Sequence, residues 1–450
     1  MADKLRSREI FGAITLAYLL AALLVLFLPL DNIAKFFLIG SGLVFLLSLL
    51  NYRFGFFLFL FLRPVIDFAT EQKLFSVGTV NVNLLFVYGG FMLLFSLIAL
   101  YANFSALRKN KLVVLWILFI LWSLVSLTYS FDTLSSVKEL SRYISIFFSF
   151  ALGATLIKKS QDLTKLIKII IFSSLIPAGV ALIQFISGRG LVEGDIIRVY
   201  GTMAHPNMLA FYLLLPITLS IFIFLTVKKT RLESYIYLVI AVFLSFILIY
   251  TYTRGAYVAL ILIFILVGLL KFRKFLLIAG VGLLVFYVAS FSFQQRFNTI
   301  FQSDPYGSIG WRLGLYRDSF TYVMESPIIG HGVGLAETII ASHRDFRLGA
   351  TQPHNDYIRL ALDGGAVGLI IYLLLIIALF SGLIKLYKKE NRSRLKMLNI
   401  FVLAFAISIY TMSIGDNILN DTTLEWLFWS LIGGLFAVQA NKKPAEIERA

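Results

Sequence analysis

The chain has 450 residues, of which 59% are hydrophobic and only 14% are charged, and it contains no cysteine. Soluble domains have about 25% charged residues, so this composition excludes an ordinary soluble protein and indicates a polytopic membrane protein. The lack of cysteine excludes disulfides and thiolate chemistry. The net charge of +16 is explained by the positive-inside rule, so we expect the lipid bilayer and not a nucleic acid as the partner of these charges.

Apolar runs of about 20 residues, the length that crosses a hydrocarbon core, recur along the whole chain. The basic start, residues 1–10, precedes an apolar run too long for a cleaved signal peptide, so we expect an uncleaved first span. No long soluble segment remains, which predicts one all-α membrane domain over residues 1–450. The third span is the weakest, because Arg63 and Pro64 interrupt it. We predict about fourteen transmembrane helices, or about twelve, at residues 10–30, 34–50, 54–68, 83–102, 112–129, 137–157, 166–186, 204–226, 234–253, 256–270, 275–292, 364–384, 398–414 and 423–440.

Basic residues fall in every second connecting segment, starting with the N-terminus. The positive-inside rule therefore predicts that both termini are cytoplasmic. The opposite segments contain no lysine after Lys138, and their basic residues are arginines. A guanidinium group matches phosphate or carboxylate with two parallel hydrogen bonds, so this bias predicts anion binding on the outer side. The alternative is that these arginines pair with lipid headgroups.

A polar interruption, residues 293–363, contains three of the four histidines. We interpret it as a large extracytoplasmic loop. An amphipathic helix is expected from about residue 309 to residue 324, carrying Arg312 and ending before Pro327. The glycine-rich sequence around His331 is expected to form a tight bend near a substrate. A second helix is expected to begin after His354 and Asn355 and to break at Gly364-Gly365.

Two further outer clusters lie before this loop. In the first, Arg198 precedes His205 and Asn207, which lead directly into a span whose free N–H groups favour an anion. The alternative is a capped helix start with a snorkelling arginine. In the second, Tyr252 and Arg254 lie at a hinge with almost no loop, where a charge is usually retained for a ligand or partner. The alternative is a structural ion pair of Arg254 with an outer carboxylate, at position 195 or 421.

His354 is the candidate general base, because imidazole titrates near neutral pH and this residue stands at a polar helix start. Taken alone, it could equally be a bystander. The sequence has no HExxH motif, no DxD motif and no G-x-S-x-G motif, so we expect neither a metal ion nor a cofactor nor a nucleophilic serine. Carboxylates and amides at residues 415–421 are suited to sugar hydroxyls, or are ordinary loop residues.

Taken in order, these motifs resemble the bacterial O-antigen ligase and polymerase superfamily. The matching patterns are R-x-x-G-x-x-x-HPN from Arg198, TRG around Arg254, PIIGxGxG at residues 327–334, HNDY from His354 and GxxGL from Gly365. The resemblance implies a GT-C-like bundle in the bacterial inner membrane, with an extracytoplasmic active site. It also implies a metal-independent glycosyltransferase that inverts the anomeric centre.

In this reading the donor is a glycan on undecaprenyl pyrophosphate, and the acceptor is a sugar hydroxyl on another glycan or on a lipid A core. By resemblance, Arg198, Arg254 and Arg312 would bind the pyrophosphate and His354 would be the catalytic base. His205, Asn207, Asn355, Tyr252 and His331 would support them. The number of spans slightly favours a polymerase, for which a chain-length regulator is a further expected partner. A flippase for lipid-linked oligosaccharides is the alternative, but the sequence lacks the internal repeats expected of a transporter.

Overall fold

The computed structural model describes residues 18–27, 32–70, 73–77, 80–101, 110–194, 196–227, 232–273, 308–343 and 351–440, with scattered positions between 276 and 298. Much of the predicted span at residues 275–292 and parts of the large loop therefore lie outside the described residues. A short apolar helix, Tyr18–Phe27, comes first in the described ranges. The labelled α-helices that follow are α2 (Asn32–Leu50), α3 (Tyr52–Ile66), α4 (Leu84–Tyr101), α5 (Lys111–Ser126), α6 (Thr133–Leu156), α7 (Ser160–Ser173), α8 (Leu175–Ile186), α9 (Pro206–Thr226), α10 (Leu232–Tyr250), α11 (Arg254–Leu270), α14 (Ser308–Glu325), α15 (Ala336–His343), α16 (Asp356–Lys389), α17 (Ser393–Met412) and α18 (Thr422–Ala440).

Seven segments among the described residues are long and apolar enough to cross a membrane. Shorter apolar helices, including α5 and α11, accompany them. A helical protein with several membrane spans is therefore confirmed, whereas the total of about fourteen spans stays a prediction. The seven segments are Leu84–Tyr101, Ser160–Ile186, Pro206–Thr226, Leu232–Tyr250, Asp356–Lys389, Ser393–Met412 and Thr422–Ala440.

The fold also contains two short antiparallel hairpins that the sequence reading did not predict. One joins β1 (Lys73–Val77) to β2 (Val80–Asn83), and the other joins β3 (Leu191–Glu193) to β4 (Ile196–Arg198). In the second hairpin Leu191 lies opposite Arg198. This hairpin matters for the site, because it carries Arg198 to the start of α9.

The predicted interruption of the third span is wrong. Helix α3 continues through Arg63 and Pro64 to Ile66. Arg63 is buried, and its guanidinium donates to Asp67 Oδ1 at 2.5 Å and to Thr422 Oγ1 at 2.5 Å. These bonds anchor the last turn of α3 to the start of α18, so tertiary contacts outweigh the usual effect of proline in a helix.

The centre of the bundle is the packing of α6 against α18. A Cβ atom on Gly433 would lie 2.1 Å from the carbonyl oxygen of Phe150, and one on Gly153 would lie 2.3 Å from the carbonyl oxygen of Ser430. The two glycines therefore let the backbones of the helices touch, as small residues do in membrane helix pairs. Trp429 fills the adjacent space, with its ring 5.0 Å from that of Trp116.

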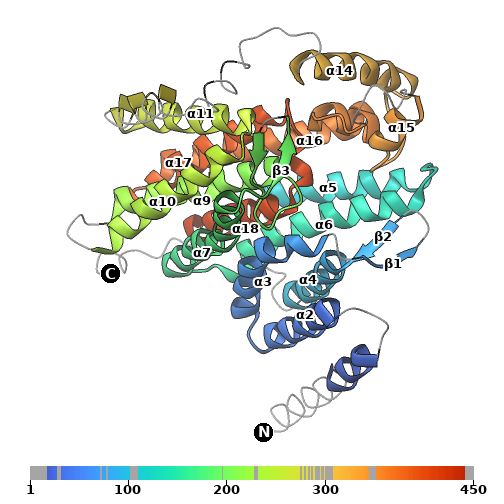
Figure 1. The fold of residues 1–450 in the computed structure, drawn as a ribbon, viewed down its shortest axis with the longest axis horizontal. Coiled ribbons are helices and arrows are strands. Elements are labelled where there is room, and N and C mark those ends of the chain that lie inside the picture. The colour runs from blue at the N-terminus through green and yellow to red at the C-terminus, as the bar shows by residue number, and fades with distance from the viewer. Residues whose placement is uncertain are drawn as a thin grey trace.

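Helices α14 and α15 lie across one side of this bundle, next to α16 and the ends of α5 and α6 (Figure 1). The helix predicted from about residue 309 to residue 324 is confirmed as α14, which ends at Glu325, two residues before Pro327; its amphipathic role stays a prediction. The predicted break in α16 is also confirmed, since Gly365 has φ 62° and ψ −165° inside the helix. Such a backbone angle is strained for any residue with a Cβ.

Candidate functional site

The loop between α17 and α18, residues 413–421, is the element on which the predicted site segments converge. The backbone N–H of Asp356 donates to the carbonyl oxygen of Ser413 at 2.9 Å. The backbone N–H of Asn355 donates to Asn417 Oδ1 at 3.1 Å. The start of α16 is therefore fixed to this loop, which we call the α17–α18 loop.

Asp416 of the α17–α18 loop joins two of the predicted clusters. Its Oδ2 accepts a hydrogen bond from Asn207 Nδ2 at 2.8 Å, and its Oδ1 lies 3.5 Å from His354 Nδ1. Burial alone would raise the pKa of the Asp416 carboxyl, but His354 and the Arg312 guanidinium lower that pKa below its ordinary value. Asp416 is therefore an anion at neutral pH, placed between an amide and an imidazole.

Arg198 is almost completely buried and makes contacts on every side of its guanidinium group. Nε donates to the carbonyl oxygen of Thr251 at 2.8 Å, and Nη2 donates to Asn207 Oδ1 at 2.7 Å and to Thr253 Oγ1 at 3.1 Å. Nη1 donates to Glu193 Oε2 at 2.6 Å. The Glu193 side chain is half exposed, at 48%. Nη1 is therefore the nitrogen of Arg198 whose partner, the Glu193 carboxylate, is accessible from the surface.

Hydrogen bonds link Glu193 to Arg198, Arg198 to Asn207 and Asn207 to Asp416. The last step is a looser contact: Asp416 Oδ1 lies 3.5 Å from His354 Nδ1, which has no hydrogen-bond partner among the described residues. The hairpin, the start of α9, the α17–α18 loop and the start of α16 supply these residues, which are far apart in the sequence. We call this set the Asp416 cluster.

His354 is held in an unusual conformation. Its φ is 47°, in the left-handed region that side-chain-bearing residues rarely adopt. The hydroxyl of Tyr316 donates to its carbonyl oxygen at 2.8 Å, and the Trp311 ring packs edge-on with centroids 5.6 Å apart. With Nδ1 directed at Asp416, Nε2 is the nitrogen left to exchange a proton with a ligand. Backbone strain of this kind is often concentrated at functional sites.

Arg312 reaches the same place from α14. Its Nη1 lies 3.8 Å from the position of a Cβ on Gly415, next to Asp416. Its Nε is buried and has no hydrogen-bond partner among the described residues. A buried guanidinium N–H without an acceptor is costly, so this donor is suited to an anionic ligand.

His205 precedes the first residue of α9, and its Nδ1 accepts a hydrogen bond from the backbone N–H of Asn207 at 3.1 Å. Burial and the nearby Arg198 charge lower the pKa of the His205 imidazole below its ordinary value. His205 is therefore neutral at pH 7 and caps the helix.

Tyr252 and Arg254 lie beside Thr251 and Thr253, the residues between α10 and α11 to which Arg198 donates hydrogen bonds. Tyr252 has φ 50° and is buried, with its ring 6.1 Å from that of Tyr250. Arg254 is the first residue of α11, directly after Thr253, and is partly buried. Both are thus adjacent in the chain to Thr251 or Thr253, to which Arg198 bonds, and Tyr252 packs as a structural residue. The predicted partner at position 195 lies outside the described residues.

The side chains of Asn355 and His331 make structural contacts within the fold. The Asn355 side chain caps α16 by accepting from the backbone N–H groups of Tyr357 and Ile358. His331 Nε2 lies 2.9 Å from the carbonyl oxygen of Tyr322 in α14. His331 therefore fastens α14 and does not belong to the Asp416 cluster.

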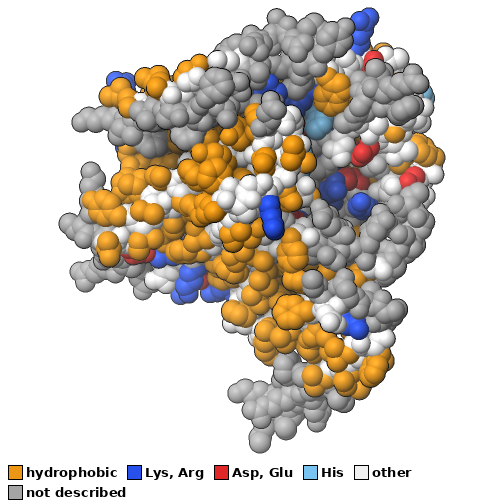
Figure 2. Space-filling view, in the orientation of Figure 1, with side chains coloured by type: hydrophobic (Ala, Val, Ile, Leu, Met, Phe, Trp, Pro, Cys, Tyr) orange, Lys and Arg blue, Asp and Glu red, His pale blue; other side chains and the backbone are white. Residues whose placement is uncertain are grey.

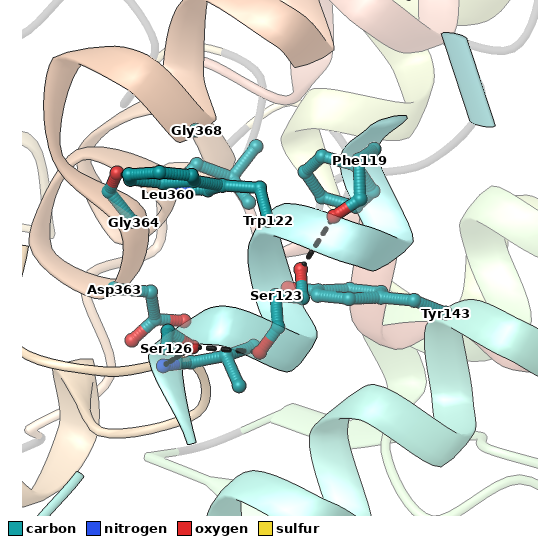
Figure 3. A pocket seen from close by; sticks show the side chains of 10 residues that line it. Phe119, Trp122, Ser123, Ser126, Tyr143, Leu360, Asp363, Gly364 and Gly368 are labelled. Carbon is teal, nitrogen blue, oxygen red and sulfur yellow. Dashed lines mark hydrogen bonds between the residues drawn. The ribbon is translucent and has the colours of Figure 1, made fainter. Parts of the chain in front are cut away.

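The glycine-rich bend at residues 330–334 packs against α16. Its N–H groups at His331 and Gly332 donate to the carbonyl oxygens of Leu362 and Asp363, at 2.8 and 2.9 Å. Figure 3 shows the adjoining pocket, lined by residues of α5, α6 and α16. Its volume is about 10 Å³, which is room for one water molecule. The sequence predicted a bend near a substrate, but this pocket is far too small for a sugar.

A second group of charges lies on the other side of the α17–α18 loop. Arg142 and Arg359 both donate to Asn420 Oδ1, and both pair with Glu139, at 2.5 and 3.2 Å. Arg142 is partly exposed, with a side chain at 23%. The loop therefore has an arginine-rich side chain cluster on each flank.

Asp416 and Glu193 are the residues that sequence reasoning missed as parts of the site. Asp416 was noted only as one of several polar residues at 415–421, because nothing in that segment singles out one carboxylate. The pairing of Glu193 with Arg198 depends on the β3–β4 hairpin, whose short strands carry no strong pattern. In the part of the chain that the structure describes, no three acidic or histidine side chains converge to hold a metal ion.

Figure 2 shows blue, red and pale-blue side chains gathered beside α14 and α15, whereas the surface over α10 and its neighbours is mainly orange. The fold and the cluster define a class: a membrane protein of several helical spans with a basic, histidine-containing site at one end of its bundle. A family model described as O-antigen ligase matches residues 238–373. This match confirms the resemblance to the O-antigen ligase and polymerase superfamily.

The matched residues run from α10 into α16 and include Arg254, Arg312 and His354. Arg198, Asn207 and Asp416 lie outside the match, so their place in the site rests on the geometry alone. No curated protein matches this chain.

Proposed function

We propose that the protein is a metal-independent inverting glycosyltransferase of the bacterial inner membrane. It moves a glycan from undecaprenyl pyrophosphate onto a sugar hydroxyl at the outer face. The observation that carries the proposal is the run of polar contacts from Arg198 to His354 through Asn207 and Asp416. It puts an anion-binding guanidinium and a candidate base on one rigid support.

The guanidinium groups would bind the donor pyrophosphate. Arg198 offers the edge now taken by Glu193, and Arg312 offers a buried N–H that has no partner among the described residues. Arg254 begins α11, where the helix dipole adds to its charge. Negative charge grows on the pyrophosphate as its bond to the sugar breaks, so fixed positive charges stabilise the transition state more than the ground state.

His354 would act as the general base. Its Nε2 takes the proton of the acceptor hydroxyl, while the acceptor oxygen bonds to the anomeric carbon. The bond from that carbon to the pyrophosphate oxygen breaks, and the electron pair leaves with undecaprenyl pyrophosphate. Asp416 then stabilises the imidazolium ion through Nδ1. Attack from the face opposite the leaving group inverts the anomeric centre.

The acceptor would lie on the amide-bearing side of the α17–α18 loop, where Asn417 is near Gln352 and Asn420 is near Arg142. Amide groups can bind sugar hydroxyls both as donors and as acceptors. A GT-C-like bundle with cytoplasmic termini fits this scheme. We favour a polymerase slightly over a ligase, because of the predicted number of spans.

Substitution of Arg254 and His354 by alanine in cells separates transfer from transport. A transferase that loses these residues stops joining glycans, and its lipid-linked donor accumulates on the outer leaflet. A flippase that loses them leaves the lipid-linked glycan on the inner leaflet. Recovery of the donor only from the inner leaflet would overturn the proposal.

A further inference from the structure

A second cavity lies at the opposite end of the bundle from the Asp416 cluster. Its volume is about 320 Å³, and it is lined by Asn51, Tyr52, Arg53, Leu156 and Lys158. Helix α3 connects the two ends: Arg53 is in its first turn, and Arg63 in its last turn bonds to the start of α18. A helix of this length spans about 22 Å, so the cavity is distinct from the proposed active site.

The polar groups around this cavity are hydrogen-bond donors. Asn51 Oδ1 already accepts from the backbone N–H groups of Arg53 and Phe54, which leaves its Nδ2 to donate. Within the described ranges, neither the Lys158 ammonium group nor the Tyr52 hydroxyl has a hydrogen-bond partner. With two cationic side chains and further hydrogen-bond donors in its lining, the cavity is suited to an anion.

One ion pair orients the Arg53 guanidinium but occupies only one of its nitrogen atoms. Its Nη1 donates to Asp162 Oδ1 at 3.1 Å, and Asp162 is buried while the Arg53 side chain is 44% exposed. The rest of the guanidinium edge stays accessible to a ligand. Lys158 also lines the cavity, so the two positive charges of Arg53 and Lys158 exceed the single negative charge of Asp162.

The neighbouring surface is apolar. Leu50 at the end of α2 is 58% exposed, and Phe54 in the first turn of α3 is 53% exposed. In a membrane protein such side chains face acyl chains. The cavity thus places cations and hydroxyl donors next to a lipid-facing surface.

We propose that this cavity binds a phosphate ester, with Arg53 and Lys158 as the cationic ligands and Tyr52 as a neutral donor. Two sources have this chemistry: the headgroup of an anionic phospholipid and a soluble phosphate ester. Basic pockets between membrane helices on the cytoplasmic side bind anionic headgroups, and these residues lie on the side predicted to be cytoplasmic. The proposal is independent of the glycosyl-transfer function.

The test uses the purified full-length protein in detergent with phosphatidylglycerol, and native mass spectrometry counts the retained lipid. Lys158→Gln is compared with Lys159→Gln, which removes the same charge from the adjacent exposed residue that does not line the cavity. We expect Lys158→Gln to weaken retention by about fivefold or more, because one charge-assisted contact is lost, while Lys159→Gln stays close to wild type. Tyr52→Phe, which removes only a hydroxyl, is expected to give a smaller loss.

Competition identifies the source of the ligand. If glycerol 3-phosphate or inorganic phosphate displaces the bound lipid, a soluble phosphate ester is a ligand; if neither does, the headgroup of a lipid is the ligand. Equal retention by the Lys158 and Lys159 variants would overturn the proposal. Equal retention of zwitterionic phosphatidylcholine and phosphatidylglycerol would overturn it as well.

Discussion

At the scale of single residues, the proposed chemistry depends on the charge of Asp416 and the position of His354. His354 sits in a strained backbone conformation and is supported by Trp311, Tyr316 and Asp416. Such support fixes the ring and leaves one nitrogen for proton transfer. Two substitutions test whether the residues act in this way.

Asp416→Asn keeps an oxygen that can accept from Asn207 but removes the negative charge beside the imidazole. We expect kcat to fall about 10- to 100-fold, with a much smaller change in the KM for the donor, because the charge stabilises only the imidazolium formed during transfer. Steady-state kinetics with a defined lipid-linked donor measure both constants. His343→Ala, at the end of α15 and bonded within its own helix, is the control. An unchanged kcat for Asp416→Asn would contradict the assigned role.

Glu193→Gln tests whether Glu193 and the donor compete for Arg198. The carboxylate is half exposed, so its pair with Arg198 is screened and contributes about 1 kcal/mol or less. Loss of the competing charge is expected to lower the KM for the donor by about two- to fivefold, with kcat nearly constant. A higher KM in this variant would mean instead that Glu193 is needed to orient Arg198.

At the scale of elements, the α17–α18 loop and the α6–α18 pair set the geometry of the site. The loop bonds to the starts of α9 and α16 and to Arg142 of α6. The end of α3 bonds to Thr422, the first residue of α18, which follows the loop directly into the bundle. Substitutions that disturb the packing of α18 are therefore expected to displace residues of the Asp416 cluster.

Gly433→Ala places a methyl group about where the backbone of α6 now lies, 2.1 Å from the Phe150 carbonyl oxygen. The helices must separate, and we expect a loss of about 1–3 kcal/mol in stability. Gly90→Ala in α4 is the control, since a Cβ there meets nothing within 4 Å. Thermal unfolding of the two variants in detergent compares them; equal midpoints would refute the close approach of α6 and α18.

Asp421 ends the α17–α18 loop and gives stability a pH dependence. Burial and the nearby Asp67 charge raise the pKa of the Asp421 carboxyl to about 7, from an ordinary value of 3.8. The folded protein therefore holds a proton that the unfolded chain releases between these values. The stabilisation is complete below pH 3.8 and is lost as the pH rises to about 7.

Asp421→Asn stays uncharged and can still accept from the backbone N–H of Leu424. We expect this variant to lose less stability than wild type between pH 5 and pH 8, which thermal unfolding at several pH values measures. Identical pH profiles for the two proteins would show that the Asp421 proton is not linked to folding.

At the scale of the whole molecule, the helices could be predicted from the sequence because apolar runs of membrane-spanning length leave few alternatives. The motifs around Arg198 and His354 also predicted segments that the structure brings together. The role of Asp416 could not be predicted, since it arises from contacts with Asn207 and His354, which are distant in the sequence from Asp416 and from each other. The continuation of α3 through Pro64 likewise goes with a bond from Arg63 to the distant Thr422, which no local pattern reveals.

The central claim is that the Asp416 cluster transfers a glycan from a lipid pyrophosphate. The most direct test incubates purified protein with a defined lipid-linked donor, offers either a second donor or a lipid A core as acceptor, and measures the joined glycan and the released undecaprenyl pyrophosphate. We predict both products in equal amounts with one of the two acceptors, and a loss of about 100-fold or more with His354→Ala. Unchanged product formation by His354→Ala, or no transfer by the wild-type protein to either acceptor, would contradict the account.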